Sequence, residues 1–172
     1  MVGCRAVPDG YGFYVTLSLG ELTLVDALQV CIDLPDDELA QIEAFTSQRP
    51  SPDSLAVQCY SRPGPSWSIR ADHGAVCVCG LLPIRPGVYQ TWCLVTQRGW
   101  REHGREITAI LHNIVKGALA TEARRIECTV LETREKARKW YARVGLVIES
   151  TMPGFGANGE AACLYVARRG ID

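Results

Sequence analysis

The stretch from Thr91 to Leu146 constrains the fold most, because strand and helix patterns alternate along it. At its centre, apolar residues recur every three or four positions, which predicts one amphipathic helix: Ile107, Ile110, Leu111, Ile114, Val115, Ala118 and Leu119. A short apolar strand over 92–95 precedes this helix, and residues 126–130 alternate like a strand after it. A strand, a crossover helix and a second strand predict a parallel pair with a right-handed connection.

A second helical stripe follows, formed by Ala137, Trp140, Tyr141 and Val144, and Gly145 is a suitable C-terminal stop. Before this unit we expect a strand over 11–19, helices over 22–32 and 36–45, and strands over 55–59, 67–70, 75–82 and 88–95. After it we expect strands over 146–151 and 161–167. The predicted fold class is mixed α/β: a mostly antiparallel sheet with one parallel strand pair, flanked by about four helices, in one domain spanning 1–172.

Composition excludes several classes of protein. The formal net charge of -1 provides no field that would gather nucleic acid or an anionic membrane. No apolar run approaches the length of a spanning helix, and the N-terminus has no apolar segment typical of a signal peptide. The eight cysteines form no CxxC pair or zinc-type spacing, so we interpret them as buried thiols of a protein in a reducing cytoplasm, rather than as metal ligands or disulfides.

The segment Ala137-Arg138-Lys139-Trp140-Tyr141-Ala142-Arg143-Val144-Gly145-Leu146 resembles the late motif of the GCN5-related N-acetyltransferase (GNAT) superfamily. The resemblance covers roughly residues 75–167. It implies that the N-terminal strand and helices within residues 1–54 would hold the site for the acceptor substrate. It implies that this helix flanks the thiol end of acetyl-CoA and that Tyr141 protonates the departing thiolate. A phenol can serve as that acid if it lies within hydrogen-bond reach. The alternative is that Tyr141 is a core aromatic.

The resemblance also implies a phosphate-binding loop at the start of the central helix, because unpaired helix N–H groups and the positive dipole end favour anions. The loop would span Trp100 to Arg105, with Arg101, His103 and Gly104 inside it. Glu106 stands where the motif has a small residue, and a carboxylate that points at a diphosphate would weaken its binding.

Other site residues carry weaker signals. The strand before the helix, with Leu94 and Val95, would orient the cofactor through its backbone. Arg134 stands where asparagine is common, and either contacts a cofactor phosphate or solvates its helix. His103 is either a phosphate ligand or an inert surface-loop residue. Glu127 is a candidate general base or a solvent-facing strand residue.

Two functions follow. The first is an acetyl-CoA-dependent N-acetyltransferase that transfers acetyl directly to a small-molecule or protein amine. The second is a catalytically inactive protein on the same fold, similar to the internal virion protein A kind of tailed phages, whose partners would be other virion or host proteins. The location would then be the host cytoplasm or the virion. We expect no metal, nucleic acid or membrane partner, and an oligomer is compatible with the apolar hairpin.

Overall fold

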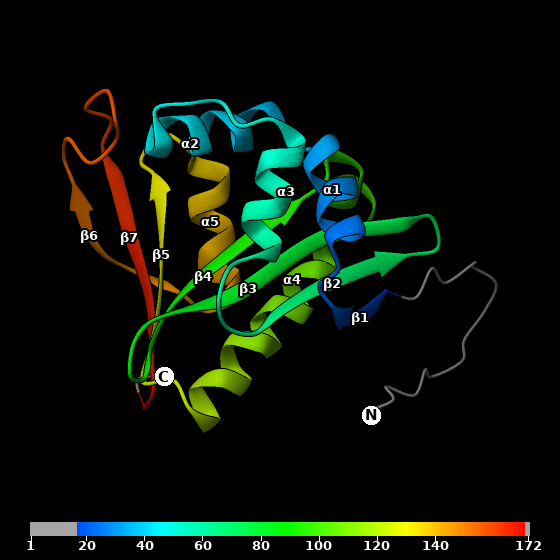
Figure 1. The fold of residues 1–172 in the computed structure, drawn as a ribbon. Helices are drawn as coiled ribbons and strands as arrows, with labels where there is room; N and C mark the ends of the chain where they lie inside the picture. The colour runs from blue at the N-terminus through cyan, green and yellow to red at the C-terminus, as the bar shows by residue number, and fades with distance from the viewer. Residues whose placement is uncertain (1–16, 171–172) are drawn as a thin grey trace.

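The computed structural model describes residues 17–170 and confirms a mixed α/β fold with one central sheet (Figure 1). The elements are β1 (Ser18–Glu21), α1 (Leu24–Ile32), α2 (Asp36–Thr46), α3 (Pro52–Tyr60), β2 (Ser66–Ala71), β3 (Gly74–Arg85), β4 (Val88–Val95), α4 (Gln97–Thr121), β5 (Arg125–Leu131), α5 (Glu135–Val144), β6 (Val147–Met152) and β7 (Ala162–Arg168). The strand order is β1-β2-β3-β4-β5-β7-β6. Of the strand expected over 11–19, residues 11–16 lie outside the described residues, as does Cys4.

Helices cover both faces of the sheet (Figure 1). One core lies between the sheet and α4 and α5, where Ile107, Leu111 and Val115 meet Ile126, Cys128 and Val130 of β5. The second core lies between the sheet and α1 and α3, and includes Val30, Leu55 and Val78. Residues 75–81 of β3 are buried almost without interruption because both cores contact this strand, as the continuous apolar run predicts.

The strand expected over 55–59 is wrong, because these residues form helix α3. Ser51 accepts a hydrogen bond from the Ser54 N–H at 3.3 Å, and Pro52 occupies the first helical turn. The buried residues are Leu55, Ala56 and Cys59, which is helical spacing. Alternation of Leu55, Val57 and Cys59 was misleading, since Val57 is 52% exposed. The sheet is therefore flanked by α1 to α5, one helix more than expected.

The parallel pair is the feature that shapes the molecule. Over the described residues, β4 and β5 pair only through Val88 with Arg125, Tyr89 with Ile126 and Gln90 with Glu127. Beyond Gln90 the two strands diverge, and β5 keeps only its pairing with β7, which runs along its other edge from Arg125 to Leu131. After Gln90, the carboxyl-terminal part of β4 is therefore paired with β3 alone. A gap opens between β4 and β5 at their carboxyl ends.

No helix within residues 17–170 combines the length and apolar character that crossing a membrane requires.

A buried carboxylate fixes α1 to the sheet. Asp26 accepts hydrogen bonds from Ser68 (3.0 Å) and from Arg70 Nε (2.9 Å), and Thr23 caps the helix through the Asp26 N–H at 3.1 Å. Burial would raise the pKa of Asp26, but the hydrogen bonds from Arg70, Thr23 and Ser68 outweigh it and hold the pKa below the usual 3.8. This carboxylate is therefore a stabilising anion.

We expect Asp26→Asn to lower the free energy of unfolding by about 2–3 kcal/mol at neutral pH, because it leaves Arg70 without its anionic partner. Since the folded pKa is depressed, this stability is present above pH 3.8 and is lost as pH falls through the folded pKa. Urea titrations at several pH values measure both effects. Asp36→Asn, which breaks an exposed pair with Arg49, is the control and should cost less than about 1 kcal/mol. Equal losses in the two variants would contradict the assignment.

Candidate active site

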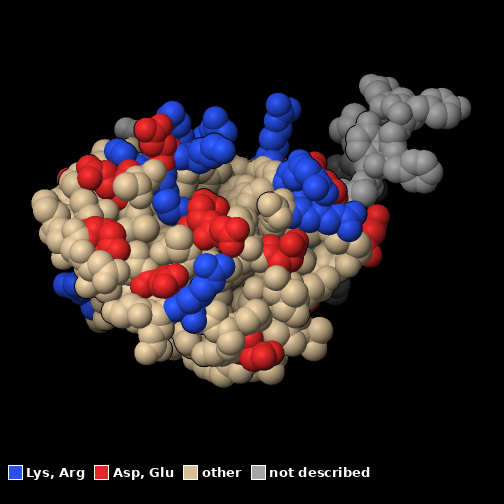
Figure 2. Space-filling view, turned by 90° about the horizontal axis from the view of Figure 1, so that it is seen from above, with Lys and Arg blue, Asp and Glu red and all other residues tan. Residues whose placement is uncertain are grey.

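A cavity of about 850 Å³ lies between α4, α5 and the start of α2, above the gap between β4 and β5. Its lining includes a basic set, Arg101, Arg105, Arg134, Lys136 and Arg143, and an acidic set, Asp37, Glu38, Glu102 and Glu106. Viewed from this end of the molecule, basic side chains stand on two sides of a hollow and acidic ones gather at its edge (Figure 2). The wall of the cavity is therefore mixed in charge.

The diverging strand offers backbone groups to this cavity. The Thr96 N–H donates to the Val76 carbonyl at 2.9 Å. Backbone groups alternate in direction along an antiparallel strand, so Thr96, Leu94 and Trp92 direct their N–H and C=O groups toward β3. The residues between them, Cys93 and Val95, direct their N–H and C=O groups toward the gap. Cys93 also lines the cavity with its side chain, whereas the Leu94 side chain packs in the core under α1 and α3. The strand predicted to orient a ligand thus has free backbone groups at Cys93 and Val95.

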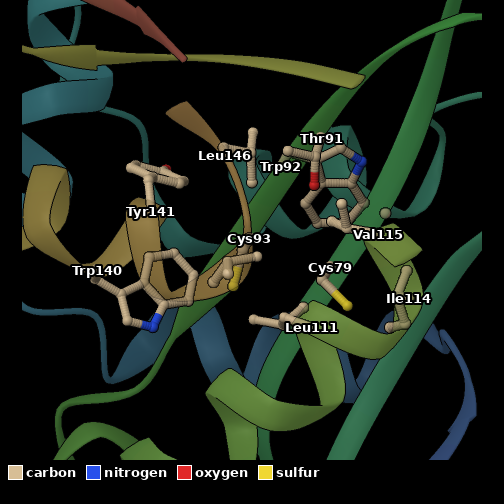
Figure 3. Close-up of a pocket in the computed structure, with 12 residues that line it drawn as sticks. Cys79, Thr91, Trp92, Cys93, Leu111, Ile114, Val115, Trp140, Tyr141 and Leu146 are labelled. Carbon is tan, nitrogen blue, oxygen red and sulfur yellow. The ribbon is translucent and has the colours of Figure 1, made fainter. Parts of the chain in front are cut away.

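Aromatic side chains form the inner wall. The rings of Trp100 and Trp140 meet edge to face at 5.1 Å, and Trp140 lies 5.0 Å from Tyr141. The Trp140 Nε1–H donates to Thr108 at 2.8 Å, which ties α5 to α4. Below them lies a small apolar cavity of about 20 Å³, where Trp140, Tyr141 and Cys93 surround one end and Leu111 and Ile114 the other (Figure 3). Tyr141 lines both cavities and stands at their junction.

The ionisable groups at this junction are held in their neutral forms. Burial raises the pKa of Tyr141 well above 10, and the neighbouring Cys128 and Glu38 add to the rise. Burial likewise raises the pKa of Cys128 to about 12, against the hydrogen bond from Tyr141. A hydrogen bond from Cys77 lowers the pKa of Cys93, but burial and nearby negative charge outweigh it and the pKa is raised. At neutral pH the site therefore holds a phenol and thiols, with no thiolate nucleophile.

The loop conformation expected over Trp100 to Arg105 is wrong, because these residues lie inside α4, whereas their role in phosphate binding stays a prediction. Their N–H groups bond within the helix. The helix starts earlier than expected because Thr96 caps it: the Thr96 hydroxyl accepts from the Gly99 N–H at 2.8 Å. Gly99 allows this start, since a Cβ there would lie 2.8 Å from the Val76 carbonyl oxygen. An Arg98–Glu102 pair at 2.7 Å supports the first turns.

The N-terminus of α4 is also occupied by the chain itself. The Gln97 N–H donates to the Asp33 carbonyl at 2.9 Å, and the Trp100 N–H bonds to Thr96 at 3.0 Å. Together with the Thr96 cap, these bonds satisfy most of the donors that would otherwise bind an anion. In place of backbone donors, the cavity offers side chains: within residues 17–170, Arg105, Lys136 and Arg143 form no ion pair.

Two predicted residues have different surroundings from those expected. Arg134 is neither solvated nor free for a phosphate, because it pairs with Asp37 (2.9 Å) and Glu38 (2.8 Å) and its side chain is 11% exposed. His103 is not a surface-loop residue; it is buried in α4 and its ring stacks on His73 with centroids 6.3 Å apart. Glu106 lines the cavity with a side chain that is 58% exposed.

The candidate bases divide between the two faces of the sheet. Glu127 alternates with Cys128, whose thiol lies beside Tyr141, so the Glu127 side chain points to the opposite face. There it pairs with Arg125 at 2.7 Å. Glu38 lines the cavity instead, and sequence analysis missed it. The only signal available was its place in the acidic first turn of α2, which helix-dipole stabilisation explains equally well.

Comparison with known proteins identifies the fold. No family model and no curated relative matches the chain. Among solved structures, a putative acetyltransferase from Acinetobacter baylyi ADP1 aligns with TM-score 0.70 and 14% identity, over 89% of this chain and 93% of that one. An acetyltransferase of GNAT family from Streptococcus pneumoniae aligns with TM-score 0.64 and 17% identity, over 90% and 100%. The chain has the GNAT fold.

A third solved structure of the same fold contains the cofactor acetyl-CoA: yncA, a putative acetyltransferase from Salmonella typhimurium, with TM-score 0.66 and 8% identity over 91% of this chain and 95% of that one. At these identities the likeness establishes the GNAT fold and no more.

The capped start of α4 has a measurable consequence. Thr96→Ala should lower the free energy of unfolding by about 1 kcal/mol, because the Gly99 N–H loses its buried acceptor. Thr96→Ser keeps the hydroxyl and should lose less than half as much. Chemical denaturation of the three proteins measures the difference. If Ala and Ser variants unfold alike, the Thr96 hydroxyl does not cap the helix.

Proposed function

We propose that the cavity binds an acyl-CoA thioester and that the protein transfers its acyl group, acetyl in the simplest case, directly to an amine. The observation that carries this proposal is the gap between β4 and β5, which opens beneath the cavity with Tyr141 at the junction. The free backbone groups of Cys93 and Val95 suit the amides of a pantetheine arm, which is an extended chain. The aromatic wall of Trp100, Trp140 and Tyr141 excludes water from the thioester end.

The fit differs between the two ends of the ligand. At the thioester end, strand backbone and apolar walls are available. At the phosphate end, the part of the chain that the structure describes offers no cradle of backbone N–H groups, and Arg105, Lys136 and Arg143 are the groups that would hold the phosphates as side-chain cations. When bound, acetyl-CoA supplies an activated acyl carbon with a thiolate leaving group.

The protein's own groups favour direct transfer. The raised pKa of Cys93 argues against a covalent acyl–cysteine intermediate, because the thiolate is the nucleophilic form. The raised pKa of Tyr141 keeps its phenol protonated throughout the neutral range, so it can donate a hydrogen bond and then a proton to developing negative charge on sulfur. We therefore assign Tyr141 as the general acid.

A second candidate function, a non-catalytic scaffold, is favoured by the occupied N-terminus of α4. The Asp33 carbonyl and the Thr96 hydroxyl take the positions where phosphate oxygens would accept hydrogen bonds. On this alternative the protein would act through its surface, as a virion component or a host-directed protein, and the cavity would bind no thioester.

Thioester binding separates the two candidates. We expect calorimetric titration with acetyl-CoA to give a micromolar dissociation constant, and S-acetyl-pantetheine to bind no more than about tenfold more weakly, because side-chain cations in water contribute little per contact. Raising the salt from about 0.05 to 0.5 M should weaken acetyl-CoA binding but not S-acetyl-pantetheine binding.

The matched variants are Arg143→Gln at the cavity and Lys116→Gln on an exposed part of α4. Only Arg143→Gln should weaken acetyl-CoA, and neither should change S-acetyl-pantetheine affinity. No heat with either ligand, and a melting temperature unchanged by excess acetyl-CoA, would favour the scaffold.

Tyr141→Phe tests the general acid. Removing the hydroxyl should lower kcat by about 10- to 100-fold while KM for acetyl-CoA changes less than about threefold, because the proton is needed only as the C–S bond breaks. Tyr89→Phe, on the paired part of β4, is the control and should keep its turnover. The measurement is thiol release in the presence of an accepted amine. Unchanged turnover in Tyr141→Phe would remove the phenol from the mechanism.

A further inference from the structure

A carboxylate from α2 lies against the acyl-transfer site assigned above. The Glu38 side chain lines the cavity and is 13% exposed, an unusual degree of burial for an acid. Burial raises the pKa of Glu38 above 4.5, and the charge of Asp37 adds to this rise, although Arg134 opposes it. Its negative charge in turn raises the pKa values of Tyr141 and Cys93. Glu38 is thus electrostatically coupled to both the candidate acid and the diverging strand.

Two contacts hold this carboxylate over the gap. Gln41, three residues further along α2 and on the same side of the helix, accepts a hydrogen bond from the Leu131 N–H at 3.1 Å. This contact fixes α2 at the carboxyl end of β5. Arg134 at the start of α5 donates to Glu38 at 2.8 Å. Figure 1 shows α2 passing across the ends of β5 and α5, which is the position these contacts require.

We propose that Glu38 is the general base of the reaction, accepting the proton of the attacking amine; this rests on the proposed acyl transfer. As the amine nitrogen forms its bond to the acyl carbon, the Glu38 carboxylate takes a proton from that nitrogen. The C–S bond breaks, its electron pair goes to sulfur, and Tyr141 gives its proton to the thiolate. Glu38 then releases its proton, Tyr141 regains one, and the products are an amide and a free thiol.

Three other carboxylates, Glu102 and Glu106 of the cavity and Glu127 of β5, suit this role less well. Hydrogen bonds from Arg101 and Arg98 lower the pKa of Glu102 to about 2, which makes it a weak base. The exposed side chain of Glu106 lies beside His103 in the third turn of α4. Glu127 lies on the opposite face of the sheet and pairs with Arg125. A base needs a pKa nearer the working pH and a place beside the reacting atoms, and Glu38 has both.

The decisive experiment compares wild type, Glu38→Gln and Asp36→Asn with acetyl-CoA and a panel of primary amines: an alkyl diamine, a polyamine and a peptide with a free N-terminus. We expect Glu38→Gln to lower kcat/KM for the amine by about 100-fold or more, with acetyl-CoA affinity changed less than about threefold. Asp36→Asn removes an exposed charge from the same first turn of α2, outside the cavity lining, and should remain within about twofold of wild type.

The pH profile distinguishes a base from a residue that only positions Arg134. The titratable and charged groups that face Glu38 are Asp37 of α2, Arg134 and Tyr141 of α5 and Cys93 of β4. In wild type, kcat/KM should rise with pH through an ionisation above 4.5, and this limb should vanish in Glu38→Gln while the limb from the amine itself persists. Glu38→Asp keeps an acid with a shorter reach, and should retain the limb at reduced turnover.

Each outcome bears on a different proposal. Wild-type turnover with Glu38→Gln within about threefold would overturn Glu38 as the base and leave acyl transfer standing. Failure of wild type to bind acetyl-CoA, or to acetylate any amine of the panel, would overturn acyl transfer and the base with it. If Glu38→Gln unfolds, the folded Glu38→Asp variant provides the test. If its kcat/KM did not rise with pH through an ionisation above 4.5, the assignment of Glu38 as the base would be overturned.

Discussion

The divergence of β4 from β5 is the constraint on which the rest of the structure depends. Three residue pairs hold the two strands together, and beyond Gln90 each strand is paired on its other edge alone, β4 with β3 and β5 with β7. A gap in a sheet exposes backbone groups that must be hydrated, ligated or covered. Here the core under α1 and α3 supports β4 from one face, and α4 and α5 flank the gap on the other. The cavity and its aromatic wall therefore follow from where the pairing ends.

Two opposing features meet at this gap. The thioester end retains free strand backbone and a protected phenol, whereas the start of α4 is closed by Thr96 and Asp33. Closing the helix with neutral acceptors stabilises the fold without any ligand, but it removes the directional donors on which phosphate binding usually relies. Any nucleotide would depend on flexible, solvated cations such as Arg105 and Arg143. Recognition would then be concentrated at the acyl end of the ligand.

Sequence patterns predicted those parts of the fold that follow from local periodicity. The apolar stripe from Ile107 to Leu119 and the stop at Gly145, with φ of 98°, are properties of single helices, and both are confirmed. The strand predicted over 55–59 was wrong because a short apolar run has no unique period, whereas the capping residue Ser51 and Pro52 start a helix there. The loop conformation predicted from Trp100 was wrong because the Thr96 cap starts α4 at Gln97, three residues before the segment that resembles the family motif.

The site was less predictable, because its members are brought together by tertiary contacts. Tyr141 could be selected from a motif, and its role stays a prediction. Glu38 could not be selected, since its burial depends on two contacts that are distant in sequence. One is its ion pair with Arg134, and the other is the hydrogen bond between Gln41 and Leu131 of β5, which lie 90 positions apart. Nothing in the local sequence of an acidic helix start distinguishes a capping charge from a buried one.

Asp26 and Glu38 illustrate that difference in energetic terms. Both are helix carboxylates paired with arginine, yet folding lowers the pKa of Asp26 and raises that of Glu38. For Asp26 the hydrogen bonds from Arg70, Thr23 and Ser68 outweigh burial, so its stabilisation is present above pH 3.8 and is lost as pH falls through the folded pKa. For Glu38 burial prevails, so folding favours the protonated carboxyl. Its contribution to the free energy of unfolding is therefore present below pH 4.5 and is lost as pH rises through the folded pKa. A carboxylate that the fold holds ready to accept a proton is the one placed beside Tyr141, whereas the carboxylate that cannot easily accept one fastens α1 to the sheet.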